Sequence, residues 1–114
     1  MVYISLYELK KKITDYQVEL LLRLNSNGRI VTTEGSNFKV WFESAGQVRE
    51  HVRVRRDVAN KLLSFGLIEH VRDQNKRYFY YSISKRGLGL LGNLGDPRIQ
   101  EIKAKIARKD SHLQ

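Results

Sequence analysis

Residues 55–83 constrain the fold more than any other part of the chain. Their first part repeats apolar residues at the spacing of one helix face: Val58, Ala59, Leu62, Leu63 and Phe65. Gly66 ends this amphipathic helix, and a strand-like run follows at 67–71. A polar, cationic turn at 72–77 leads into a second strand-like run at 78–83. The pattern therefore predicts a helix followed by a β-hairpin, which places the chain in the α+β class.

The face of this helix opposite the apolar stripe carries polar side chains. At about 100° per residue, the centre of that face falls on Asn60 and Ser64, with Asp57 and Lys61 beside them. In the returning strand, side chains two residues apart share a face. We therefore expect three of its side chains to point inward: Phe79, Tyr81 and Ile83.

Two capping boxes mark helix starts in the N-terminal part of the chain. Residues 5–8 and 14–17 each begin with a hydroxyl side chain and end with Glu or Gln, a pair that satisfies the first helix amides. They predict a short helix to about Lys12 and a second helix with an apolar stripe. The turn-forming residues 25–28 end this second helix.

Two strand-like runs come next, at 29–33 and 38–42, and the turn residues 34–37 separate them. We expect the two runs to pair as a hairpin. Residues 44–54 fit two structures, because the serine at their start caps a short helix whereas their valines at even positions suit a strand. We favour the helix and keep the strand as the alternative.

The C-terminal part predicts two more helices. Ser84 is expected to cap a short helix that contains Leu88, Leu90 and Leu91, and Asp96 with Pro97 starts the last helix. The last helix carries a narrow apolar seam at spacings of three and four residues: Ile99, Ile102 and Ile106. Such a seam pairs with another helix. We expect it to form a homodimer, with packing on the chain's own domain as the alternative.

Charge is the feature that indicates a partner. The chain has 114 residues, with 21 Lys and Arg against 12 Asp and Glu, so its formal net charge is +9. Ten cations and four anions fall between residues 49 and 86, which gives +6 over 38 residues and leaves +3 for the other 76. This excess favours polyanions, meaning nucleic acid or an anionic membrane face, over neutral partners.

The order of these elements resembles the winged helix-turn-helix family of DNA-binding domains. Two segments carry the resemblance. At 58–68 helix residues lead into Gly66, Leu67 and Ile68, and at 81–91 a strand end, a hydroxyl cap, a glycine and leucines follow one another. The resemblance implies a winged-helix domain at 1–92, with an extra β-hairpin before the recognition helix, and a C-terminal helical extension at 93–114. This chain departs from the family in the long interval before residue 53, because the family has a compact helix there.

The family's DNA-binding roles fall on two segments of this chain. The recognition helix would be 55–65 and the wing 72–77. Asn60 is expected to read an adenine edge, and the cations to contact phosphates. The residues expected to bind DNA are Arg53, Arg55, Arg56, Asn60, Lys61, Ser64, Arg72, Asn75, Lys76 and Arg77.

These observations predict a sequence-specific binder of double-stranded DNA. We expect a dimeric transcriptional regulator that acts by occupying a promoter, with half-sites roughly 34 Å apart. The alternative is a winged-helix protein–protein interaction module of a transcription or replication assembly. Tyrosines and phenylalanine at 78–81 that stack on single-stranded bases are a weaker alternative.

Other chemistries find little support in the sequence. The chain has no cysteine, and its three histidines lack a second ligand at metal spacing. Residues 87–92 match G-x-G-x-x-G, but only 22 residues follow, too few for a dinucleotide-binding unit. No apolar run approaches the ~18 residues that cross a bilayer. We therefore expect a cytoplasmic, nucleoid-associated protein that is not an enzyme, has no metal site or cofactor, shows no evident small-molecule ligand and does not contact membranes.

Overall fold

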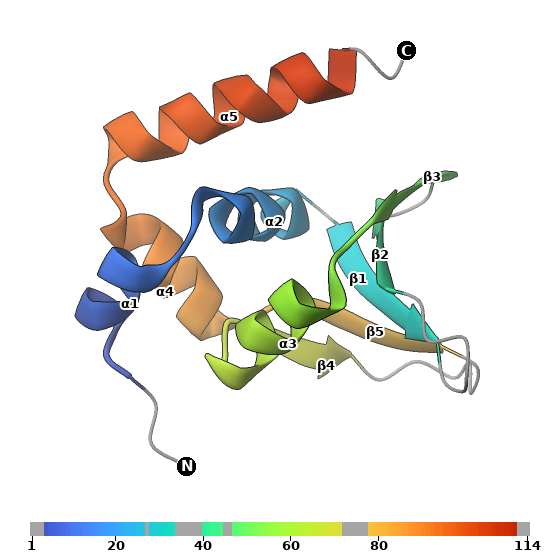
Figure 1. Ribbon diagram of the computed structural model, residues 1–114, viewed down its shortest axis with the longest axis horizontal. Helices are drawn as coiled ribbons and strands as arrows, with labels where there is room; N and C mark the ends of the chain where they lie inside the picture. Colours follow the sequence, from blue (N-terminus) through green and yellow to red (C-terminus); the bar gives the residue numbers. More distant parts are fainter. Residues whose placement is uncertain (1–3, 27, 34–39, 45–46, 72–77, 112–114) are drawn as a thin grey trace.

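Helices lie at both ends of the described chain, and strands with one helix between them form its middle, as Figure 1 shows. The computed structural model describes residues 4–26, 28–33, 40–44, 47–71 and 78–111. In chain order, the elements in these ranges are α1 (Leu6–Lys12), α2 (Asp15–Asn25), β1 (Gly28–Thr33), β2 (Val40–Ser44), β3 (Gln47–Arg53), α3 (Arg56–Ser64), β4 (Ile68–Val71), β5 (Tyr78–Ile83), α4 (Lys85–Asn93) and α5 (Asp96–Ser111). The α+β class is therefore confirmed. Among the described residues, no helix is long and apolar enough to span a bilayer.

The strands form one antiparallel sheet in the order β3-β2-β1-β5-β4. The expected hairpin of β1 and β2 is confirmed, with Ile30 opposite Phe42. The second hairpin joins β4 to β5, with Ile68 opposite Ile83, and β5 also pairs with β1. Strand β1 therefore lies at the centre of the sheet and connects the two hairpins.

The helix that we favoured within residues 44–54 is wrong, because residues 47–53 form strand β3. This strand pairs with β2, so that Phe42 lies opposite Val52 and Trp41 opposite Arg53. The pairing supplies partners for backbone groups that a one-turn helix would leave to water. The alternation of valines at even positions was thus the better guide.

The hydroxyl caps predicted from the sequence are present at three helix starts. The Ser5 Oγ accepts from the Glu8 amide at 3.2 Å. Thr14 and Gln17 form a reciprocal capping box, with distances of 3.2 and 3.0 Å. The Ser84 Oγ accepts from the Gly87 amide at 3.0 Å and donates to the Gly66 carbonyl at 2.6 Å. Ser84 therefore caps α4 and also links it to the end of α3.

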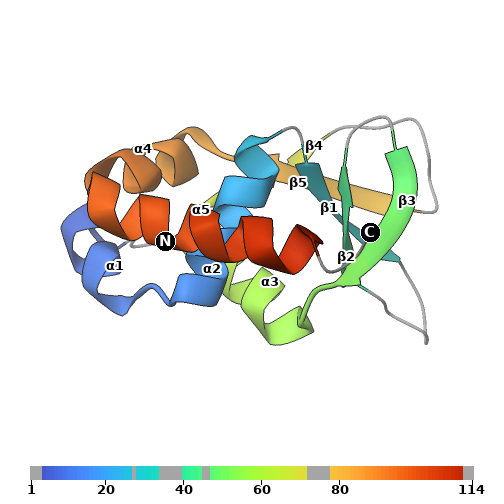
Figure 2. The same cartoon turned by 90° about the horizontal axis from the view of Figure 1, so that it is seen from above.

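The hydrophobic core lies between α2 and the other elements. Its fully buried side chains come from five elements and one linker: Leu9, Val18, Leu20, Leu21, Ile30, Leu62, Leu67 and Leu90. Gly66 adopts a φ of 73°, a conformation that glycine tolerates best, and it turns the chain from α3 into the buried Leu67. The C-terminal helix α5 runs alongside α2 in both views (Figures 1 and 2).

The isoleucine seam of α5 packs within the chain. Ile102 is 2% exposed and belongs to the core, and Ile99 and Ile106 pack against it. The Arg98 guanidinium fastens the start of α5 by donating to the Ile13 carbonyl at 2.9 Å. These three isoleucines therefore pack on the chain's own domain, which was the alternative to dimerisation through this seam. A homodimer stays a prediction that needs another surface.

Two side chains expected to be buried are exposed instead. Tyr81 and Ile83 pack against the core as predicted, but Phe79 is 36% exposed. Leu63, which we expected to widen the buried stripe of α3, is 44% exposed. Conversely Tyr80, on the other face of the sheet, is 8% exposed. Both faces of β5 are thus partly covered, so that alternation alone does not identify the buried side.

Candidate nucleic-acid interface

The exposed face of α3 is the part of the predicted site that the structure describes best. Asp57, Asn60, Lys61 and Ser64 are exposed, whereas Leu62 is buried. The face predicted from the helical spacing is therefore the one that lies outside the core. Five of the residues expected to bind DNA lie together here, at the start of α3 or along it: Arg55, Arg56, Asn60, Lys61 and Ser64.

The C-terminal end of α3 is held by hydrogen bonds from distant residues. The Leu67 amide donates to the Leu62 carbonyl at 3.0 Å, which closes the helix end around Gly66. The Arg86 Nε donates to the Phe65 carbonyl at 2.8 Å, and another nitrogen of the same guanidinium donates to the Ile4 carbonyl. Such bonds fix the direction of the helix, and hence of its exposed face.

Charge on this face is mainly positive because its one acid is paired. The Arg55 Nη2 lies 3.1 Å from the Asp57 Oδ2, and both side chains are largely exposed. Arg55 is also the residue before α3, and no side-chain hydrogen bond caps the helix there. The first amides of α3 and the basic residues around them favour an anion such as phosphate.

The remaining predicted residues fall on segments about which less is described. Arg53 ends β3, and two residues separate it from Arg56, where α3 begins; its side chain lies outside the described part. Four residues of the predicted wing lie outside the described residues altogether: Arg72, Asn75, Lys76 and Arg77. Val71 and Tyr78, which border this segment, belong to the paired strands β4 and β5.

Sequence reasoning missed the structural use of two arginines. Arg86 was counted with the basic stretch, but its guanidinium binds backbone carbonyls of α3 and of the N-terminal segment. The Arg29 guanidinium lies 4.0 Å from the ring centroid of Tyr80, on the sheet face away from α3. A charge count does not separate such arginines from those that are free to meet a ligand.

No group of three metal-binding side chains occurs within the ranges that the structure describes. His70 instead lies beside two aromatic rings, with centroid distances of 5.6 Å to Tyr81 and 6.0 Å to Phe79. Comparison of the chain with protein-family models, with curated proteins and with solved structures finds no match. A function must therefore be inferred from the residues themselves.

Proposed function

We propose that this protein binds double-stranded DNA by placing the exposed face of α3 in the major groove. The observation that carries the proposal is this face itself, which combines an amide, a hydroxyl and several cations on one exposed side of a firmly anchored helix. A major groove is wide enough to accept one helix. The net charge of +9 adds a long-range attraction to DNA.

The order of elements supports a winged-helix arrangement. Helix α2, strand β1, helix α3 and the β4–β5 hairpin follow one another in that order, and β5 pairs with β1. The hairpin β2–β3 stands where the family has a compact helix. In this chain a strand, and not a helix, therefore leads into α3, which would change the angle at which α3 meets the groove.

Each exposed residue of α3 has a distinct role in the proposed complex. The Asn60 amide both donates and accepts, so it suits the two hydrogen-bonding groups of an adenine edge. Lys61 and Arg56 supply charge to phosphates. Asp57 would repel a phosphate, but its pairing with Arg55 at 3.1 Å offsets that repulsion.

We further propose that the protein regulates transcription by occupying promoter DNA. Two copies on half-sites one helical turn apart would raise affinity and specificity. Because Ile99, Ile102 and Ile106 pack within the chain, the contact between copies would use other residues. Sedimentation with and without a duplex measures whether the second copy joins only on DNA.

The proposal is tested by titrating a fluorescent duplex with the full chain at several salt concentrations. If ~5 to 7 phosphates are neutralised per chain, the logarithm of the association constant should fall against the logarithm of salt with a slope of about −5 to −6. The competitor is unlabelled duplex of random sequence. A slope near zero would contradict the proposal, because phosphate contacts release counterions.

A further inference from the structure

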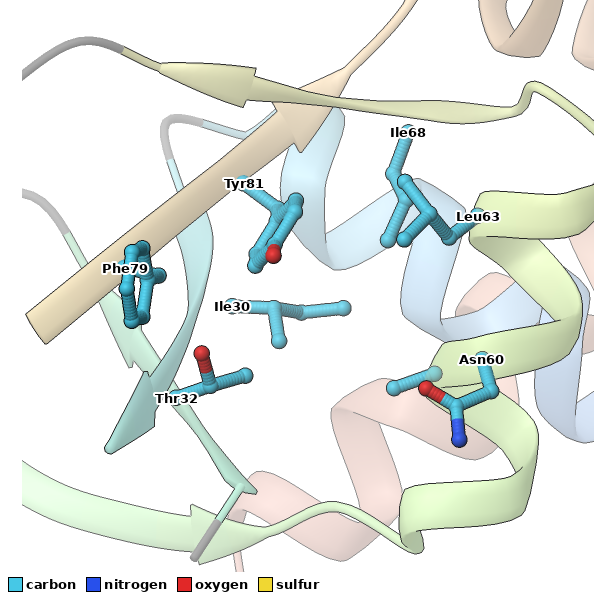
Figure 3. A pocket seen from close by; sticks show the side chains of 8 residues that line it. Ile30, Thr32, Asn60, Leu63, Ile68, Phe79 and Tyr81 are labelled. Carbon is cyan, nitrogen blue, oxygen red and sulfur yellow. The ribbon is translucent and has the colours of Figure 1, made fainter. Parts of the chain in front are cut away.

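A cavity of about 220 Å³ lies between α3 and the sheet (Figure 3). Its floor is made by Ile30 of β1, Ala59 of α3 and Ile68 of β4, all of them buried. Its rim is made by Leu63 and Phe79, which are 44% and 36% exposed. The cavity is therefore a recess with an apolar floor that opens to solvent.

The recess is also lined by polar side chains. Thr32 is only 7% exposed, and its side chain lines the recess from β1, as Figure 3 shows. Tyr81 lines the same space from β5, and Asn60 from α3. Within the described part of the chain, the side chains of these three residues make no hydrogen bond. An apolar recess with a few polar groups on its lining is the usual form of a small-molecule site.

We propose that this recess binds a small aromatic molecule of one or two rings that carries one hydrogen-bonding group. A volume of about 220 Å³ is larger than the roughly 150 Å³ of an apolar cavity that binds benzene, which suits a ligand of one or two rings. The rings of Phe79 and Tyr81 offer aromatic contacts, and the His70 ring next to them extends this aromatic wall. The polar group of the ligand would pair with the Thr32 hydroxyl.

The size of the exposed apolar surface favours a small molecule over a protein partner. Among the described residues of the recess, only Leu63 and Phe79 are large hydrophobic side chains with an exposed surface. The exposed Val71 pairs with Tyr80 and so lies on the other face of the sheet. A protein interface usually needs ~800 Å² from each partner, much more than two side chains supply.

The proposal is tested with 2-naphthol, which has two rings and one hydroxyl. It is titrated into the full chain without DNA, so that the outcome does not depend on the proposed DNA binding. We expect one saturable site with a dissociation constant of about 1 mM or below, and amide NMR shifts at Thr32, Ala59 and Tyr81. Binding that does not saturate, or shifts centred on the exposed Tyr7 and Leu88, would overturn the proposal.

Two pairs of variants sharpen the test. Thr32→Val keeps the shape of the side chain but removes its hydroxyl, and should weaken 2-naphthol about five-fold without weakening naphthalene. Ser64→Ala removes an exposed hydroxyl outside the recess and should change neither. Leu63→Ala opens the rim and should weaken both probes, whereas Leu88→Ala, at an equally exposed leucine on α4, should not. Equal effects of Leu63→Ala and Leu88→Ala would show that the recess is not the site.

Discussion

Asn60 and Lys61 are both exposed on α3, but their side chains bind different groups. Asn60 and Lys61 follow one another on the helix, so that their side chains point about 100° apart. The amide of Asn60 has a directional pair of hydrogen-bonding groups, whereas the Lys61 ammonium is a point charge without sequence preference. The proposed complex therefore assigns base recognition to one residue and phosphate attraction to the other.

Asn60→Ala is expected to lower affinity for a preferred duplex by about 1–3 kcal/mol while leaving random duplex almost unchanged. Lys61→Ala should weaken preferred and random duplexes alike and reduce the salt slope by about 1. Fluorescence anisotropy with both duplexes measures the two effects. Loss of discrimination in Lys61→Ala but not in Asn60→Ala would contradict these roles.

Two glycines of α4 provide a stability test of the packing. A Cβ on Gly87 would lie 2.4 Å from the Leu67 carbonyl oxygen, so that the backbone of α4 or of the α3–β4 linker would have to move. We expect Gly87→Ala to lower the free energy of unfolding by about 2 kcal/mol or more. Gly92→Ala, where a Cβ meets nothing within 4 Å, should raise it by up to about 1 kcal/mol. Urea denaturation compares them, and a Gly87→Ala protein as stable as Gly92→Ala would contradict the packing described here.

Local signals predicted the helices well, but the strands depended on distant partners. The caps at Ser5, Thr14 and Ser84 lie within four residues of the groups that they satisfy, and all three were predicted. Strand β3 was not, because its partner β2 decides its structure and the local sequence also fits a helix. A local stretch of ten residues does not include both β3 and β2, so it cannot decide between helix and strand for residues 47–53.

The candidate site was predictable only where helical periodicity governs it. The spacing of Val58, Leu62 and Phe65 correctly predicted that Asn60 and Ser64 are exposed. The recess under α3 was not predictable, because it depends on how far α3 stands from β1 and β5. The exposure of Leu63 and Phe79 has the same cause, since both border the recess.

At the scale of elements, Ser84 makes the junction between α3, β5 and α4. Its hydroxyl donates to the Gly66 carbonyl and accepts from the Gly87 amide, and the residue is buried. Ser84→Ala should therefore lower the free energy of unfolding by about 2–3 kcal/mol. Ser5→Ala removes an exposed cap of α1 and should cost about 0.5–1 kcal/mol. Thermal and urea unfolding measure the free energy of unfolding of both variants. Equal losses in Ser84→Ala and Ser5→Ala would contradict the junction described here.

At the scale of the whole molecule, we compare the ion pairs on the α5 side with those on the α3 side. On the α5 side, the Lys109 Nζ lies 2.6 Å from the Glu19 Oε1, and the Arg98 Nη2 lies 3.1 Å from the Asp15 Oδ1. On the α3 side, the ion pair of Arg55 with Asp57 neutralises one cation, while Lys61 adds a charge on the outer face. The proposed DNA surface therefore depends on which cations are paired with acids as well as on where the cations lie.

The most direct test of the DNA proposal compares Lys61→Glu with Lys103→Glu, which change the net charge equally. Both residues are exposed, one on α3 and the other on α5. In anisotropy titrations of one duplex at ~0.1 M salt, we expect Lys61→Glu to weaken binding at least ten-fold. Over several salt concentrations, the slope should become less negative by about 1. Lys103→Glu should stay within about two-fold of the unchanged protein. Equal losses in both variants would mean that DNA senses only the total charge and would contradict binding through α3.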